Sequence, residues 1–141
     1  MQRCVWEYEQ PRERVWAQVH DVDQWPIGIE DFDLVVGHKF RTGPLPVLGT
    51  HYVGRLFCQV NEVIEYELVT LRLYAPKYNG EVATCWDLCW KLSDAASSGT
   101  LWATELHGVR DEDPQERILL TVLKIALRWI HGHAGHCLGC S

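Results

Sequence analysis

The sequence predicts an α+β fold in which a curved antiparallel sheet wraps around a C-terminal helix. A short strand at residues 3–9 leads directly into a helix at residues 11–19. Several extended segments follow, and one long apolar helix at residues 113–132 comes only after them. Because the sheet and the last helix each have an apolar face that must be covered, we expect them to pack on each other. Any space left between them is where we look for function.

Size and composition restrict the class of protein. The chain has 141 residues, 47% of them hydrophobic and 23% charged, which is typical of one soluble globular domain. We assign residues 1–132 to this domain and residues 133–141 to a C-terminal tail rich in His and Cys. The formal net charge of -6, with no cluster of Lys or Arg, argues against nucleic acid and anionic membranes as partners.

The longest apolar stretch, residues 118–130, is interrupted by Thr121, Lys124 and Arg128, so it is too short and too charged to span a bilayer. Residues 1–10 contain no continuous apolar run, so no secretory signal is predicted and we expect a cytoplasmic protein. The six cysteines are then expected to be reduced thiols.

The N-terminal elements are indicated by prolines. Pro11 suits the first position of a helix, because it lacks an N–H and has a fixed φ. Val15, Trp16 and Val19 follow at helical spacing and form one narrow apolar face. Residues 20–31 mix Asp, Trp, Pro and Gly, so we expect a turn there, with or without a second short helix.

The middle of the chain is predicted to form strands. We predict extended segments at residues 33–40, 51–60, 68–74, 84–92 and 100–108. The segment 84–92 alternates most clearly, with Trp and Leu on one face and Cys, Asp and Lys on the other. Cys85 and Cys89 lie in this one strand, with Cα atoms about 13 Å apart, so they are too distant to form a disulfide.

The last helix has the strongest start signal. Asp113 can cap it, Pro114 suits the first helical position, and Glu116 can return a hydrogen bond to the cap residue. Ala126 lies near the middle of the apolar face, where a small side chain leaves room above the sheet. Gly132 is a natural end for the helix.

Four local patterns suggest a family. They are PRERVW at residues 11–16, GHKFR at 37–41, the segment from 49–54 to VNEV at 60–63, and the segment from Gly99 to LHG at 106–108. In their order and spacing the chain resembles the START-like helix-grip superfamily (SRPBCC), in particular the branch of the heat-shock-protein-90 ATPase activator and polyketide cyclases.

The resemblance implies a helix-grip fold of about six antiparallel strands with a deep apolar cavity. Such cavities hold lipid-like, aromatic or polyketide-like molecules, and some members of the superfamily are aromatases or cyclases. The chain departs from the family pattern at Trp25-Pro26, where two tryptophans are usual, and at His107, which is shifted by one position to the opposite face. Its tail has no counterpart in the family.

Aromatic residues are the main candidates for a ligand site. Trp86, Trp90 and Trp102 are predicted to face the last helix, where they either fill the core or form the wall of a pocket. The remaining candidates are polar groups that could orient a ligand, together with the small residue of the helix: Tyr52, Arg72, Tyr74, Thr104 and Ala126. For Arg72 the alternative is a solvated position on a strand.

The tail suggests a metal site. His133, His136, Cys137 and Cys140 are ligand types that suit zinc, and the glycines between them would let them converge. The alternative is a frayed chain end. No other cofactor is expected.

Three functions are compatible with the sequence. The first is binding of a small apolar molecule under the last helix. The second is a cyclase or dehydratase on the same scaffold, which needs a titratable group in the cavity, although no catalytic constellation stands out and Asp87 and Glu105 are both predicted to be exposed. The third is an interaction module, because Leu120 and Leu127 flank the buried face and could form a homodimer contact.

Overall fold

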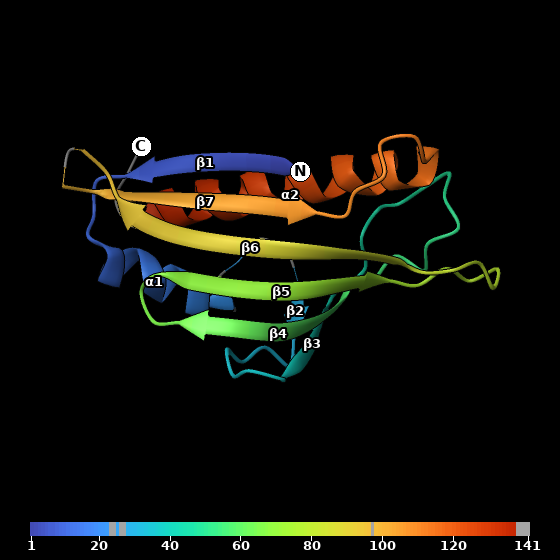
Figure 1. Ribbon diagram of the computed structural model, residues 1–141, viewed down its shortest axis with the longest axis horizontal. Coiled ribbons are helices and arrows are strands. Elements are labelled where there is room, and N and C mark those ends of the chain that lie inside the picture. Colours follow the sequence, from blue (N-terminus) through green and yellow to red (C-terminus); the bar gives the residue numbers. More distant parts are fainter. Residues whose placement is uncertain (23–24, 26–27, 97, 138–141) are drawn as a thin grey trace.

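The protein has an α+β fold built from one seven-stranded sheet and two helices (Figure 1). The computed structural model describes residues 1–22, 25, 28–96 and 98–137, and at positions 133, 136 and 137 it describes the backbone alone. The elements are β1 Gln2–Tyr8, α1 Arg12–His20, β2 Ile29–Glu30, β3 Lys39–Thr42, β4 Phe57–Ile64, β5 Leu68–Ala75, β6 Thr84–Asp94, β7 Thr100–His107 and α2 Pro114–Cys137. The strands are antiparallel in the order β1-β7-β6-β5-β4-β3-β2, so there are seven strands where about six were expected.

The predicted and observed strands differ in the middle of the chain. The strand predicted at residues 33–40 begins only at Lys39, and the strand predicted at 51–60 begins only at Phe57. Gly37 and Gly54 have φ angles of 87° and 93°, which interrupt an extended backbone just before each strand. The two-residue strand β2 was not predicted, because it has no length over which alternation can be detected.

Helix α1 buries Val15, Trp16 and Val19, as predicted. It begins at Arg12, and Pro11 precedes it as the N-cap residue with an extended backbone, φ -70° and ψ 163°. The region proposed for a second short helix includes positions 23–24 and 26–27, which lie outside the described residues.

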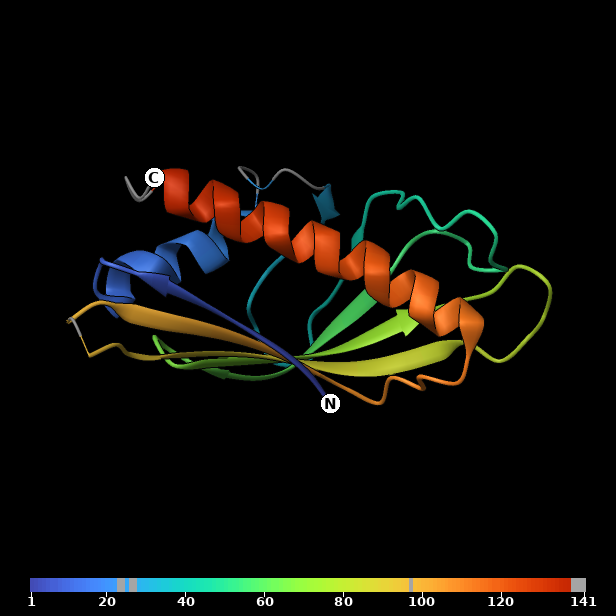
Figure 2. The same cartoon turned by 90° about the horizontal axis from the view of Figure 1, so that it is seen from above.

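Both helices cover the same face of the sheet, and α2 runs along its whole length (Figure 2). Strand β6 shows why the sheet has a dry face and a wet face: Trp86 and Trp90 are buried, whereas Cys85 and Asp87 are exposed. Cys85 and Cys89 are free thiols of this one strand, as predicted. The core therefore lies between the sheet and α2.

Helix α2 begins as predicted but continues further. The Asp113 carboxylate accepts hydrogen bonds from the backbone N–H of Gln115 at 2.9 Å and of Glu116 at 3.3 Å, so it caps the helix. The predicted end at Gly132 is wrong, because the helix runs to Cys137. Ala134 is buried in this last turn, and its packing outweighs the low helix propensity of the glycine. The predicted boundary between the domain and the tail, after Gly132, therefore falls inside this helix.

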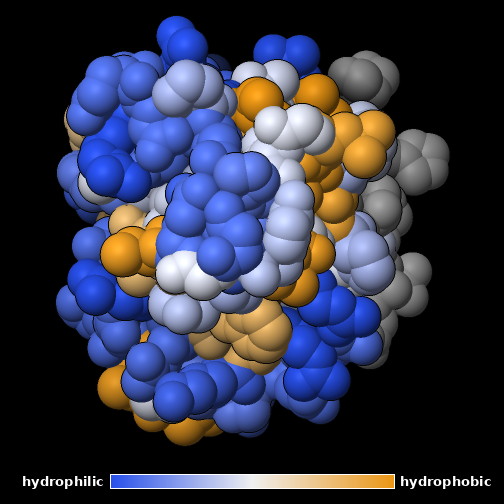
Figure 3. Space-filling model, turned by 90° about the vertical axis from the view of Figure 1, so that its right-hand side faces the viewer, coloured by the Kyte–Doolittle hydropathy of each residue, from blue (hydrophilic) through white to orange (hydrophobic). Residues whose placement is uncertain are grey.

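The surface of α2 also differs from the prediction. Leu120 and Leu127, expected to be exposed, are buried with 7% and 3% of their surface accessible. The large apolar residues that α2 exposes are Ile118, Ile125 and Trp129. In an end-on view, exposed hydrophobic side chains gather mainly on the helix-bearing side of the molecule, whereas the sheet side is largely hydrophilic (Figure 3). Neither of the described helices is long and apolar enough to cross a membrane.

Candidate functional site

Helix α2 is held on the sheet by polar contacts near both ends. Near its start, the buried Glu116 carboxylate accepts hydrogen bonds from Trp86 Nε1 at 2.9 Å and from Arg110, through the backbone N–H at 3.0 Å and Nε at 2.5 Å. The Glu116 carboxylate was expected to accept the backbone N–H of Asp113, and it makes these contacts instead. Near the end of the helix, the hydroxyl of Tyr8 lies 2.7 Å from Nδ1 of His131. The two attachments are separated by about 22 Å of helix, at 1.5 Å per residue.

A cavity lies under the part of α2 between these attachments. Its volume is about 50 Å³ and its exposed wall is entirely apolar. The lining residues come from the sheet, from the segment before β3 and from α2: Trp25, Ile29, Phe32, Phe40, Thr42, Leu56, Cys58, Leu71, Leu73, Leu88, Trp90, Leu123, Leu127 and Ile130. The predicted space between sheet and helix therefore exists, but the side chains fill most of it.

Four buried polar atoms, one of them on a residue of the cavity wall, have no hydrogen-bond partner in the described part of the chain. They are Nε1 of Trp90, Nε1 of Trp102, Oγ1 of Thr104 and Nε2 of His131. The four residues contact one another. Trp90 is the cross-strand partner of Thr104, and the ring of Trp90 lies edge-on to the ring of Trp102, with centroids 5.9 Å apart. The ring of Trp102 lies 4.4 Å from the ring of His131. An unpaired buried polar atom costs about 1–3 kcal/mol unless water or a ligand supplies its partner.

Burial determines the charge state of Cys58, which lies in the cavity wall, and of His131, whose ring contacts Trp102. Desolvation lowers the pKa of His131 to about 3, so the imidazole is neutral near pH 7. It also stacks on Trp6, with ring centroids 3.9 Å apart. Desolvation raises the pKa of the Cys58 thiol to about 12, so Cys58 is protonated and a poor nucleophile.

The residues predicted to face the helix have different environments. Trp90 lines the cavity, and Trp102 and Thr104 are fully buried beside it. Trp86 instead donates its N–H to Glu116. Ala126 is buried on α2 without belonging to the cavity wall.

The other three predicted residues lie elsewhere. The buried hydroxyl of Tyr52 is hydrogen-bonded to Oγ1 of Thr84 at 2.8 Å, away from the cavity. Arg72 and Tyr74 are exposed on the outer face of β5, so they cannot contact a molecule under α2. Arg72 is paired there with Asp87, its Nε lying 3.1 Å from Oδ1.

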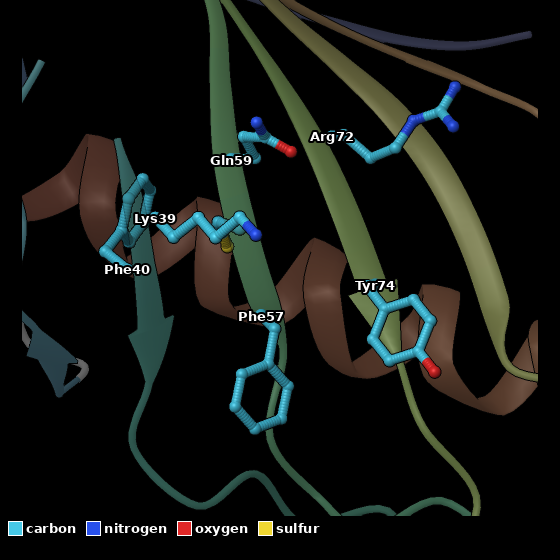
Figure 4. Close-up of a pocket in the computed structure, with 7 residues that line it drawn as sticks. Lys39, Phe40, Phe57, Gln59, Arg72 and Tyr74 are labelled. Atoms are coloured by element: carbon cyan, nitrogen blue, oxygen red, sulfur yellow. The ribbon is translucent and has the colours of Figure 1, made fainter. Parts of the chain in front are cut away.

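On this outer face Arg72 and Tyr74 help to line a second hollow, an open groove of about 420 Å³ (Figure 4). Its other lining residues are Lys39, Phe40, Phe57, Cys58 and Gln59. Lys39, Phe57 and Gln59 were not predicted from the sequence, since only the pairing of β3 with β4 and of β4 with β5 brings them beside Arg72 and Tyr74. No local pattern in the sequence encodes that pairing.

The predicted zinc ligands cannot be placed. Cys140 and the side chains of His133, His136 and Cys137 lie outside the described part of the molecule, although the backbone of the last three is helical. Among the described residues, no group of three or more His, Cys, Asp or Glu side chains could hold a metal ion. The zinc site therefore stays a prediction.

Comparisons with known proteins show the fold. No family model matches the chain, and no curated protein matches it. Among solved structures, protein MLL2253 from Mesorhizobium loti superimposes with a TM-score of 0.74 at 20% identity, over 98% of this chain and 97% of that one. DynU16, a protein of the dynemicin biosynthetic locus, gives 0.68 at 17% identity, over 97% of this chain but only 46% of its own length. CalU16 from Micromonospora echinospora gives 0.65 at 14% identity, over 94% and 74%. The chain shares their fold, a curled antiparallel sheet gripping a long helix.

Proposed function

We propose that this protein binds a small, mainly apolar molecule that carries oxygen atoms, in the space between the sheet and α2. The observation that carries the proposal is the apolar cavity bordered by unpaired polar atoms. The N–H groups of Trp90 and Trp102 are donors for which the described residues supply no acceptor. A hydroxyl or carbonyl oxygen on an aromatic or polyketide-like molecule would supply one, while its carbon skeleton contacts the apolar wall.

The size of the cavity defines what binding requires. At about 50 Å³ it has roughly one third of the volume of an engineered cavity of about 150 Å³ that admits benzene. A ligand must therefore displace side chains. Phe32 is only partly buried and lies between Trp25 and Phe40 at ring distances of 6.3 and 5.0 Å, so it is the lining residue that we expect to move.

The comparisons are compatible with this proposal. DynU16 is described only by its place in the dynemicin biosynthetic locus, and a place in such a locus supports a small molecule as the ligand of this fold. The membership in the START-like superfamily inferred from sequence would account for the shared architecture. Such likeness alone does not transfer an activity, because one scaffold hosts unrelated functions.

The observations favour binding over catalysis. A cyclase or dehydratase needs a titratable group that reaches its substrate. Within the described cavity wall the titratable group is Cys58, whose thiol stays protonated near pH 7, and His131 contacts Trp102 outside the wall. Leu120 and Leu127 are buried, so they cannot form the homodimer contact considered from the sequence.

Two cavity variants test the proposal with 2-naphthol as a neutral aromatic probe. Leu127→Ala enlarges the cavity from the α2 side, and we expect at least tenfold tighter binding of 2-naphthol by titration calorimetry. Cys58→Leu fills the cavity from β4, and we expect at least tenfold weaker binding. Both cost stability, about 2–5 kcal/mol for the first and 1–3 kcal/mol for the second, so folding is checked by circular dichroism.

Glu62→Gln is the matched control, because Glu62 lies on β4 with Cys58 but is exposed and lines neither the cavity nor the outer groove. Native mass spectrometry of freshly purified protein supplies an independent test, since a retained organic molecule of defined mass supports the proposal. If Leu127→Ala, correctly folded, takes up no 2-naphthol, or if the probe binds all variants equally, the cavity is not a ligand site.

A further inference from the structure

The groove on the outer face is formed by two neighbouring rows of side chains that cross the strands. In the first row Lys39 on β3 is the register partner of Gln59 on β4, which is paired in turn with Arg72 on β5. In the second row Phe57 on β4 lies directly opposite Tyr74 on β5. A polar, cationic row thus runs beside an aromatic pair.

The two aromatic side chains are exposed, so a ligand can displace water from their surface. Phe57 and Tyr74 have 41% and 44% of their surface accessible. Figure 4 shows the two rings at one end of the groove, while Lys39 extends onto β4 between Gln59 and Phe57 and the Gln59 amide points toward β5. Aromatic side chains on adjacent strands offer a surface on which another flat ring can stack.

The charge of the groove is positive on a protein whose formal net charge is -6. Arg72 is neutralised by Asp87 on β6, with N–O distances of 3.1 and 3.4 Å. Lys39 makes no ion pair with any of the described residues, whereas Lys91, on the same outer face at β6, is paired with Glu105 at 3.2 Å. The groove therefore has one uncompensated positive charge, next to the amide of Gln59.

We propose that this groove binds a small planar aromatic molecule that carries a single carboxylate. The ring would stack on Phe57 and Tyr74, and the carboxylate would contact Lys39 and the Gln59 amide, with the Arg72 guanidinium within the same row. The volume of about 420 Å³ is sufficient for a molecule of two or three fused rings. Because the groove is open on one side, binding is expected to be weak and fast.

This site is separate from the cavity under α2. The strands lie between the two hollows, which share Phe40 and Cys58, whereas Lys39, Gln59, Arg72 and Tyr74 line the groove alone. An anion is also a poor ligand for the inner cavity, whose exposed wall is apolar. Lys39→Gln and Tyr74→Ser therefore test the groove without changing the inner wall, and Leu127→Ala tests the cavity without changing the groove.

The test uses 2-naphthoate and its neutral analogue 2-naphthylmethanol, titrated into the full chain and followed by amide chemical shifts. We expect 2-naphthoate to shift the amides of residues 39–41, 57–59 and 72–74. Lys39→Gln should weaken 2-naphthoate about fivefold and leave 2-naphthylmethanol unchanged, in line with an exposed charge contact. Tyr74→Ser should weaken both probes about tenfold through lost stacking.

Lys91→Gln is the matched control, because it removes one positive charge from the same face outside the groove. Raising the salt from about 50 to 300 mM should weaken 2-naphthoate alone. The proposal is overturned if 2-naphthoate does not bind, if Lys39→Gln and Lys91→Gln have equal effects, or if the groove amides shift with protein concentration instead of with probe. The last result would assign this face to contact with a second copy of the chain.

Discussion

Glu116 attaches the start of α2 to the sheet, and replacing it offers a quantitative test of the fold. In Glu116→Gln the amide oxygen can still accept the N–H groups of Trp86 and of the Arg110 backbone. The amide NH₂ then faces Nε of Arg110, so one charge-assisted hydrogen bond is replaced by two opposed donors. Hydrogen bonds to charged groups contribute about 1.5–3 kcal/mol.

More than half of the Arg110 side chain is exposed, so its guanidinium can turn to water and recover part of this loss. We therefore expect Glu116→Gln to lower the free energy of unfolding by about 2 kcal/mol. Glu116→Leu, which leaves the N–H groups of Trp86 and Arg110 without acceptors, should lower it by about 3–5 kcal/mol. Both are large fractions of a typical total stability of about 5–15 kcal/mol.

The assay is urea unfolding followed by circular dichroism, with the variants compared at constant m-value. Glu112→Gln is the control, since Glu112 is exposed in the turn that precedes α2 and its replacement should change the stability by less than about 0.5 kcal/mol. A double-mutant cycle with Trp86→Phe should give a coupling energy of at least about 0.5 kcal/mol. A loss below about 1 kcal/mol for Glu116→Gln, or strict additivity with Trp86→Phe, refutes the attachment.

Two further predictions concern buried titratable groups. Because the folded protein keeps His131 neutral down to pH about 3, whereas the unfolded chain takes up a proton near 6.5, stability should fall as the pH is lowered between these values. The expected loss in the free energy of unfolding is about 2–3 kcal/mol at pH about 4.5, and His131→Phe should remove this loss. Urea unfolding of both proteins across this pH range is the measurement, and an equal pH dependence would contradict the prediction. Iodoacetamide should alkylate the exposed Cys85 in the folded protein and Cys58 only after unfolding, as checked by peptide mass spectrometry, and early labelling of Cys58 would show that the core opens near β4.

The elements with regular periodicity could be predicted from the sequence. Residues 84–92 alternate without interruption, and the structure confirms β6 there with its tryptophans buried. The start of α2 was predictable because capping depends on neighbours in the chain, as the Asp113 contacts show. The end of α2 was not, because the packing of Ala134 depends on distant parts of the chain and outweighs the local signal of Gly132.

The candidate sites were only partly predictable, for a related reason. Alternation assigns a strand residue to one of two faces, and for Tyr74 the face toward α2 was the wrong one, whereas Arg72 has the solvated position that was its alternative. Lys39 and Phe57 became candidates only through cross-strand register, which no single segment encodes.

The amino-acid sequence by itself determined the fold class, the buried faces of α1, β6 and β7 and the position of the long helix after the strands, because these depend on local periodicity and capping. The tertiary structure alone decided how much space remains under α2 and which side chains meet across strands. Both depend on the packing of side chains from segments far apart in the chain, so they follow from the assembled sheet and helix and not from any one segment.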